Sequence, residues 1–138
     1  MKYFIYSIII FIVLMFTNMN AQTMNINNPF FSEYKTPYQT PPFDEIKEEH
    51  YLPAFEEGIK IKRAELDAII NNPEKPTFEN TVAAIEKSGE LLTKVSRVFF
   101  NISGSNGNDA TQKIAETITP QLSKLNNDIV LNEKLFQR

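Results

Sequence analysis

From Asp44 onward, apolar residues recur at every third or fourth position, which is the repeat of an amphipathic α-helix. Three such stretches follow one another, and residues that favour helix ends separate them. No segment of useful length alternates apolar and polar residues as a half-buried strand does, and no internal repeat is present. The sequence therefore predicts an all-α fold, built as helical hairpins or a small bundle over residues 44–138.

The first stretch places acidic Glu48 and Glu49 in the opening turn, where the helix dipole favours negative charge. Pro53 is tolerated only near the start of a helix, and Asn71-Asn72-Pro73 predicts its end. The apolar stripe of this helix consists of Leu52, Phe55, Ile59, Leu66 and Ile70.

The second stretch begins with Thr77, a favourable N-cap residue. Gly89 stands where its stripe would continue, at a cost of about 1 kcal/mol relative to alanine. We expect either a close neighbouring helix there or a bend. Two glycines and polar residues predict a loop at 104–108. The stripe comprises Phe78, Val82, Ile85, Leu92, Val95, Phe99 and Ile102.

The third stretch opens at Asp109, with Gln112 completing an approximate capping box. Pro120 predicts a kink. A fourth segment begins with the plausible cap Asn132 and stops at Arg138. We expect these helices to leave apolar surface exposed that faces a larger structure. The third stripe consists of Ile114, Ile118, Leu122, Leu125 and Ile129.

The N-terminal segment is typical of a secretory signal peptide. Lys2 precedes an apolar run from Tyr3 to Phe16, and the small residue Ala21 follows. Cleavage after Ala21 would make residues 1–21 a signal peptide and export the protein to the periplasm or the extracellular space. The alternative is a retained membrane anchor, although the run is shorter than the roughly 20 residues that span a bilayer.

Residues 22–43 alternate prolines with aromatic residues and predict an extended arm without regular helix. A free linker would be poorer in aromatic side chains. We expect the arm to pack along its own protein, and the alternative is a Pro-rich ligand for another domain.

Composition excludes several chemistries. The 138 residues include no Cys and one His, so neither a thiolate nucleophile nor a two-histidine metal site can form within the chain. A net charge of -3 gives no electrostatic footprint for nucleic acid, which we do not expect as a partner.

Few residues could carry chemistry. His50 follows two glutamates, but we interpret it as a near-surface histidine at a helix start rather than a metal ligand. Glu86 and Glu90 are spaced to share a helix face, where paired carboxylates could divide acid and base roles if buried. The flanking residues Lys87 and Lys94 favour a solvated face instead.

Three further patterns are weak. Lys60, Lys62 and Arg63 could form a phosphate site, but a solvated face is the simpler interpretation. The glycines at 103–108 lack the lysine of a phosphate loop. Asn101-Ile102-Ser103 matches the acceptor pattern for N-glycosylation, a pattern that often occurs by chance. No serine has a triad signature. We assign no catalytic, cofactor-binding or metal-binding residue.

Several segments in one order resemble the opening of zinc metallopeptidases of the thimet oligopeptidase type, and among these the bacterial peptidyl-dipeptidases. The resemblance covers residues 28–138. The segments that carry it are 28–31, 36–37, 40–46, 49–56, 71–73, 76–81, 88–92, 98–101 and 131–136.

This resemblance implies an all-helical enzyme several times longer, with one zinc ion bound by an H-E-x-x-H helix and a later glutamate. Oligopeptides would be the substrate, and the opening helices would form part of one channel wall. None of the zinc motif falls within this chain, so we expect zinc only in the complete enzyme.

Two hypotheses follow. In the first, the chain is the N-terminal portion of an exported peptidyl-dipeptidase, truncated before its catalytic motif and non-catalytic alone, with the missing C-terminal portion as its partner. In the second, it is a free-standing exported helical module that binds a peptide or protein through an apolar stripe.

Overall fold

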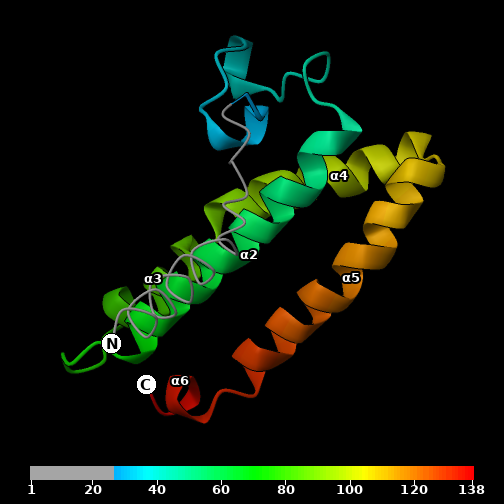
Figure 1. Cartoon of the computed structure of the whole chain (residues 1–138). Helices are drawn as coiled ribbons and strands as arrows, with labels where there is room; N and C mark the ends of the chain where they lie inside the picture. Colours follow the sequence, from blue (N-terminus) through cyan, green and yellow to red (C-terminus); the bar gives the residue numbers. More distant parts are fainter. Residues whose placement is uncertain (1–26) are drawn as a thin grey trace, which may run out of the picture.

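The computed structural model describes residues 27–138, and these form helices and turns without a strand. The predicted all-α fold is confirmed. The predicted signal peptide, residues 1–21, lies outside the described residues. Figure 1 shows α2 and α4 side by side, α5 along the other flank of α2, and the arm at one end. The elements are η2 (Pro29–Phe31), η3 (Pro37–Gln39), α2 (Glu48–Ile70), η4 (Phe78–Ala83), α3 (Ala84–Lys87), α4 (Glu90–Asn106), α5 (Asp109–Val130) and α6 (Glu133–Gln137).

Aromatic side chains join the arm, α2 and α4 into one core. Phe99 of α4 is fully buried, and its ring lies 5.0 Å from that of Tyr51 and 5.4 Å from that of Phe55, both on α2. Phe30 of the arm is 1% exposed and packs 5.6 Å from Tyr51. Tilted and edge-on aromatic pairs of this kind add stability beyond the area they bury.

Helices α2 and α4 approach closely at Gly58. A Cβ atom at Gly58 would lie 3.0 Å from the Cα of Leu92, so any side chain there would meet backbone. Glycine is required at this position by the contact between the two helices rather than by its own backbone angles.

Helix α5 is a surface helix that packs on α2. Ile118 and Leu125 are buried, whereas its outward residues are mostly polar. Arg63 of α2 donates to Asp128 of α5 at 2.8 Å. The N-cap of α5 is Asn108, one residue earlier than the predicted Asp109. The Asn108 side chain accepts a hydrogen bond from the backbone N–H of Thr111, and the Thr111 hydroxyl accepts one from the backbone N–H of Asn108. The helix continues through Pro120.

The second predicted helix is interrupted. A π-helical turn, η4, begins after the predicted cap Thr77 and passes into α3, which ends at Lys87 with Ser88 as its C-cap. Gly89 has φ +75°, a left-handed conformation that favours glycine, and α4 starts afresh after it. Lys62 of α2 fills the space beside Gly89 and donates to the carbonyls of Ile85 and Ser88. Both expected causes, a bend and a close neighbour, therefore coincide.

One predicted boundary was wrong. The loop predicted at 104–108 is helical as far as Asn106, because the C-terminal turns of α4 continue past Gly104. The first helix begins at Glu48, so Glu48 and Glu49 lie in its opening turn as predicted. Within the arm, Phe30 and Phe31 pack against the core formed by α2 and α4, and the short turns η2 and η3 interrupt the extended backbone.

Exposed apolar side chains gather at the end of the molecule that α6 occupies. Arg138 donates to the carbonyls of Asn72 and Glu74, which places the α6 end beside the start of η4. We call this surface the apolar end. Its large exposed residues are Phe78, Val82, Val130, Leu131 and Phe136.

The close approach at Gly58 predicts opposite effects for two glycine-to-alanine substitutions. Gly58→Ala should lower the free energy of unfolding by about 1 kcal/mol or more, because overpacking against backbone outweighs the gain in helix propensity. Gly104→Ala, with no neighbouring atom within 4 Å, should raise it by up to about 1 kcal/mol. Urea unfolding of both variants measures this, and a stabilised Gly58→Ala would contradict the packing.

Candidate functional site

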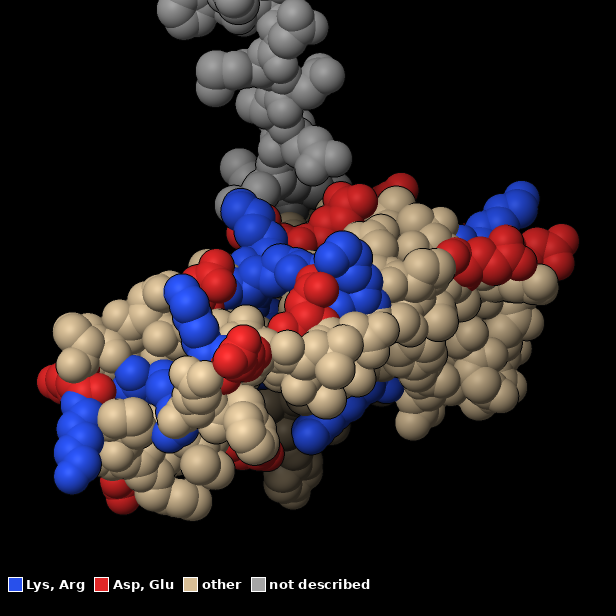
Figure 2. Space-filling model, turned by 90° about the horizontal axis from the view of Figure 1, so that it is seen from below, with Lys and Arg blue, Asp and Glu red and all other residues tan. Residues whose placement is uncertain are grey.

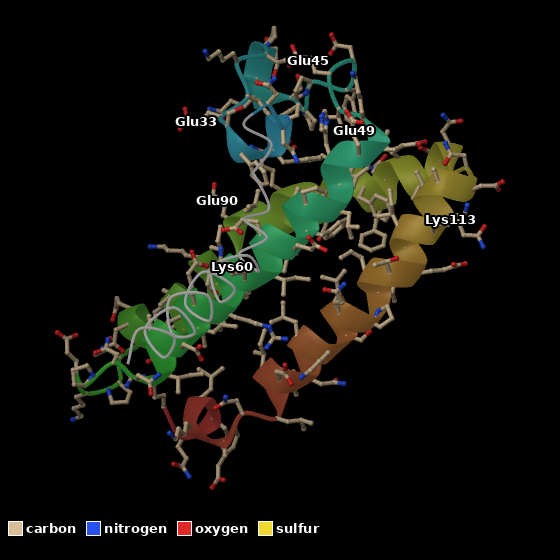
Figure 3. The ribbon with its side chains drawn as sticks, in the orientation of Figure 1. Glu33, Glu45, Glu49, Lys60, Glu90 and Lys113 are labelled. Atoms are coloured by element: carbon tan, nitrogen blue, oxygen red, sulfur yellow. The ribbon has the colours of Figure 1, made fainter. Side chains whose placement is uncertain are left out.

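A shallow, open concave surface lies between the arm and helices α2 and α4. We call it the arm groove, and its volume is about 480 Å³. Figure 3 shows Glu33 and Glu90 on this flank of the molecule, with Lys60 farther along α2. The lining residues are Phe30, Phe31, Ser32, Glu33, Glu57, Ile61, Glu90, Leu91 and Lys94.

Lys94 of α4 fixes the arm that forms one wall of the groove. Its Nζ donates to the carbonyls of Phe30 at 3.2 Å and Ser32 at 2.6 Å, and lies 3.9 Å above the ring of Tyr34. Burial lowers the pKa of Lys94, against the opposing effect of Glu90 and Glu33. Two hydrogen bonds and a cation–π contact make this lysine the main polar attachment of the arm to α4.

Tyr34 lies beneath this lysine. Its hydroxyl is buried without a hydrogen-bond partner. Burial, and then the neighbouring Tyr51, raise the pKa of Tyr34 to about 12. A buried hydroxyl without a partner carries a desolvation cost, so the ring rather than the oxygen accounts for the contribution of Tyr34 to the fold.

His50 does begin a helix, but the prediction of a near-surface side chain was wrong, because the residue is only 6% exposed. Its Nδ1 accepts a hydrogen bond from the backbone N–H of Lys47 at 3.0 Å. The imidazole thus caps the N-terminus of α2. Its Nε2 is 3.9 Å from Glu49, and no second metal-ligating side chain joins them.

Glu86 and Glu90 do not share a helix face. The break at Ser88 and Gly89 puts Glu86 on α3 and Glu90 in the first turn of α4. Both are exposed, which agrees with the interpretation that they are solvated. The carboxylate pair that their spacing suggested does not form.

The basic residues Lys60, Lys62 and Arg63 do not converge on one point. Lys60 pairs with Glu57 at 3.0 Å, Lys62 caps the end of α3, and Arg63 pairs with Asp128. A shared phosphate site is therefore contradicted. Figure 2 likewise shows basic and acidic side chains next to one another on the face it presents.

The glycine pattern at 103–108 forms no loop that could surround a phosphate, since Gly104 is helical and Gly107 ends α4. Asn101 of the glycosylation pattern lies exposed on the same helix.

No helix in the described part of the chain is long and apolar enough to cross a membrane.

Among residues 27–138, no three His, Cys, Asp or Glu side chains come close enough to hold a metal ion. Residues 1–26 contain none of these residue types. The arm groove therefore offers an apolar floor, carboxylates and a lysine. These lining residues include no cluster that could hold a zinc ion.

Sequence reasoning missed the residues that organise this surface. Lys94 was treated only as a flanking charge, and Tyr34 only as one of the aromatic residues of the arm. Their contact joins positions far apart in sequence, and no local pattern encodes it. The proline and aromatic composition of the arm was the one available signal.

The described residues thus form an all-α fold with a shallow concave surface between the arm, α2 and α4. No family profile matches the sequence. The chain is homologous to dipeptidyl carboxypeptidases, with 47% identity over 111 residues to that of Salmonella typhimurium. It is 48% identical over 115 residues to that of Escherichia coli.

These matches are unequal in extent. They cover 80% and 83% of this chain but 16% and 17% of the Salmonella and Escherichia relatives. The chain therefore spans about a sixth of the length of the curated relatives it matches.

The unpartnered hydroxyl predicts a benign Tyr34→Phe substitution. At neutral pH the free energy of unfolding of the variant should equal that of the wild type or exceed it by up to about 1 kcal/mol. The reason is that the substitution keeps the ring and removes the buried, unpartnered oxygen. Because burial raises the pKa of Tyr34 to about 12, this pKa is higher in the folded protein than in the unfolded chain. The wild type therefore keeps its full stability below about pH 10 and loses part of it as the pH rises toward about 12.

Thermal unfolding of both proteins between neutral and alkaline pH measures this difference. The wild type should lose more stability than Tyr34→Phe in the alkaline range. A variant that is clearly less stable at neutral pH would indicate that the hydroxyl has a partner.

Proposed function

We propose that this chain is the N-terminal helical portion of an exported peptidyl-dipeptidase of the thimet oligopeptidase type. In this proposal the helices form one wall of the channel that admits oligopeptides, and catalysis depends on residues outside this chain. The observation that carries the proposal is the nearly 50% identity along four-fifths of this chain to one sixth of dipeptidyl carboxypeptidases.

The zinc ion that such a peptidase requires has no fitting ligands here. The one histidine is committed to a helix cap, and no cluster of suitable side chains lies in the described residues. The proposal therefore assigns zinc binding and water activation to the rest of the enzyme. The role left to this chain is to position and enclose the substrate.

Two surfaces support a structural role. The apolar end exposes Leu131 at 80% and Phe136 at 90%, and exposed apolar patches are typical of surfaces that contact another part of a protein. The arm groove could accept part of an extended peptide. Export rests on the predicted signal peptide alone, and the periplasm or extracellular space remains the proposed location.

A chimera tests the proposal. Residues 28–138 replace the matching segment of the Escherichia coli dipeptidyl carboxypeptidase, and release of dipeptides from peptide C-termini is measured. We expect the rate to stay within about tenfold of the parent, since the catalytic residues are untouched.

Phe99→Ala in the chimera is the control. Loss of a buried phenylalanine costs about 3–5 kcal/mol and should abolish or strongly reduce activity by disrupting the wall. A well-folded chimera that releases no dipeptide would refute the proposal. If the isolated chain also bound peptides in the arm groove, that result would favour the free-standing binding module.

A further inference from the structure

The apolar end combines two segments that are far apart in the sequence. Phe78 and Val82 belong to η4, whereas Leu131 precedes α6 and Phe136 lies within it. All four side chains are more than half exposed. Single exposed apolar residues are normal on a protein surface, but a group of large ones is typical of a surface that contacts another protein or another part of the same one.

Polar contacts attach the η4 segment to the rest of the chain at both of its ends. Arg138 of α6 donates to the side chain of Asn80 at 3.5 Å, which joins α6 to η4 (Figure 1). Beyond α3, the N–H of Gly89 donates to the carboxylate of Glu65 of α2 at 2.6 Å. The exposed apolar residues of η4 are therefore not needed to hold this segment in place.

A small hollow lies next to these exposed residues, between α2, α5 and α6, and its volume is about 150 Å³. Asn132, which follows Leu131, also lines it, as does the ion pair of Arg63 and Asp128. An apolar cavity of about this size can accept a benzene-sized group, so one leucine or phenylalanine side chain fits the hollow. Its apolar lining consists of Leu66, Ile70, Leu125, Ile129 and Leu135.

We propose that the apolar end is the surface through which this chain docks on the rest of the peptidase, with one apolar side chain of that part seated in the hollow. This inference rests on the proposed function. The occupant is inferred from the extent of the matches, because this chain corresponds to only about a sixth of the dipeptidyl carboxypeptidases. Docking at the apolar end uses none of the residues that line the arm groove.

Replacement of two exposed residues by glutamate tests whether the complete enzyme buries them. The double variant Leu131→Glu, Phe136→Glu is made in the full 138-residue chain and in the chimera described above. In the chain alone both side chains face water, so the equilibrium constant of unfolding should change less than about threefold. In the chimera the carboxylates would be buried without partners, and the midpoint of thermal unfolding should fall by about 5 °C or more.

Tyr38→Glu is the matched control, because Tyr38 is an equally exposed aromatic residue in the arm, at the opposite end of the molecule. It should change the stability of the chain and of the chimera only slightly. A double variant that leaves the chimera as stable as its parent would overturn the proposal, and so would one that destabilises the chain alone to the same extent.

A photo-crosslinker gives a second measurement that needs no destabilised variant. Phe136→p-benzoylphenylalanine in the chimera should crosslink to peptides from outside residues 28–138, which mass spectrometry identifies. Crosslinks between two copies would make a second copy the occupant and would overturn the proposal, as would the absence of crosslinks.

Neither measurement uses peptidase activity, so the two proposals can fail separately. A folded chimera that crosslinks from position 136 but releases no dipeptide would contradict the proposed function and support the docking surface. A chimera that releases dipeptides without this crosslink would do the reverse.

Discussion

Burial of the Phe99 ring between Tyr51 and Phe55 is the interaction on which the rest of this structure depends. It joins α4 to α2, and through Tyr51 it gives Phe30 of the arm a surface to pack on. The close approach at Gly58 extends that contact along α2 and α4. Helix α5 then needs only one apolar stripe, because its main contact is with α2. The position of the arm groove follows from this arrangement.

Local periodicity predicted the helices but not the contacts between them. The buried positions Phe55, Ile59 and Leu66 follow from spacing alone. The break at Gly89 does not, because it depends on Lys62, a lysine from another helix that caps α3. A pattern within one segment contains no information about a side chain that arrives from elsewhere.

The same limit applies to the candidate site. Because the sequence contains one histidine, its composition alone predicts that no two-histidine zinc site can form within this chain. That His50 is buried and that its backbone carbonyl accepts a hydrogen bond from Asn28 could not be predicted, because Asn28 reaches His50 only in the folded chain. The role of Lys94 could not be predicted either, because nothing in the sequence distinguishes it from the other lysines. Composition could therefore exclude chemistry, but only geometry could assign roles.

Our proposal assigns enclosure of the substrate to this chain and catalysis to residues outside it. It is based on the similarity of the chain to about a sixth of the dipeptidyl carboxypeptidases. The most direct test is to incubate the purified chain with equimolar zinc, remove free metal by gel filtration, and assay retained zinc and dipeptide release together. Our account predicts neither stoichiometric zinc nor dipeptide release. One tightly held zinc ion per chain, with dipeptides released from peptide C-termini, would contradict it.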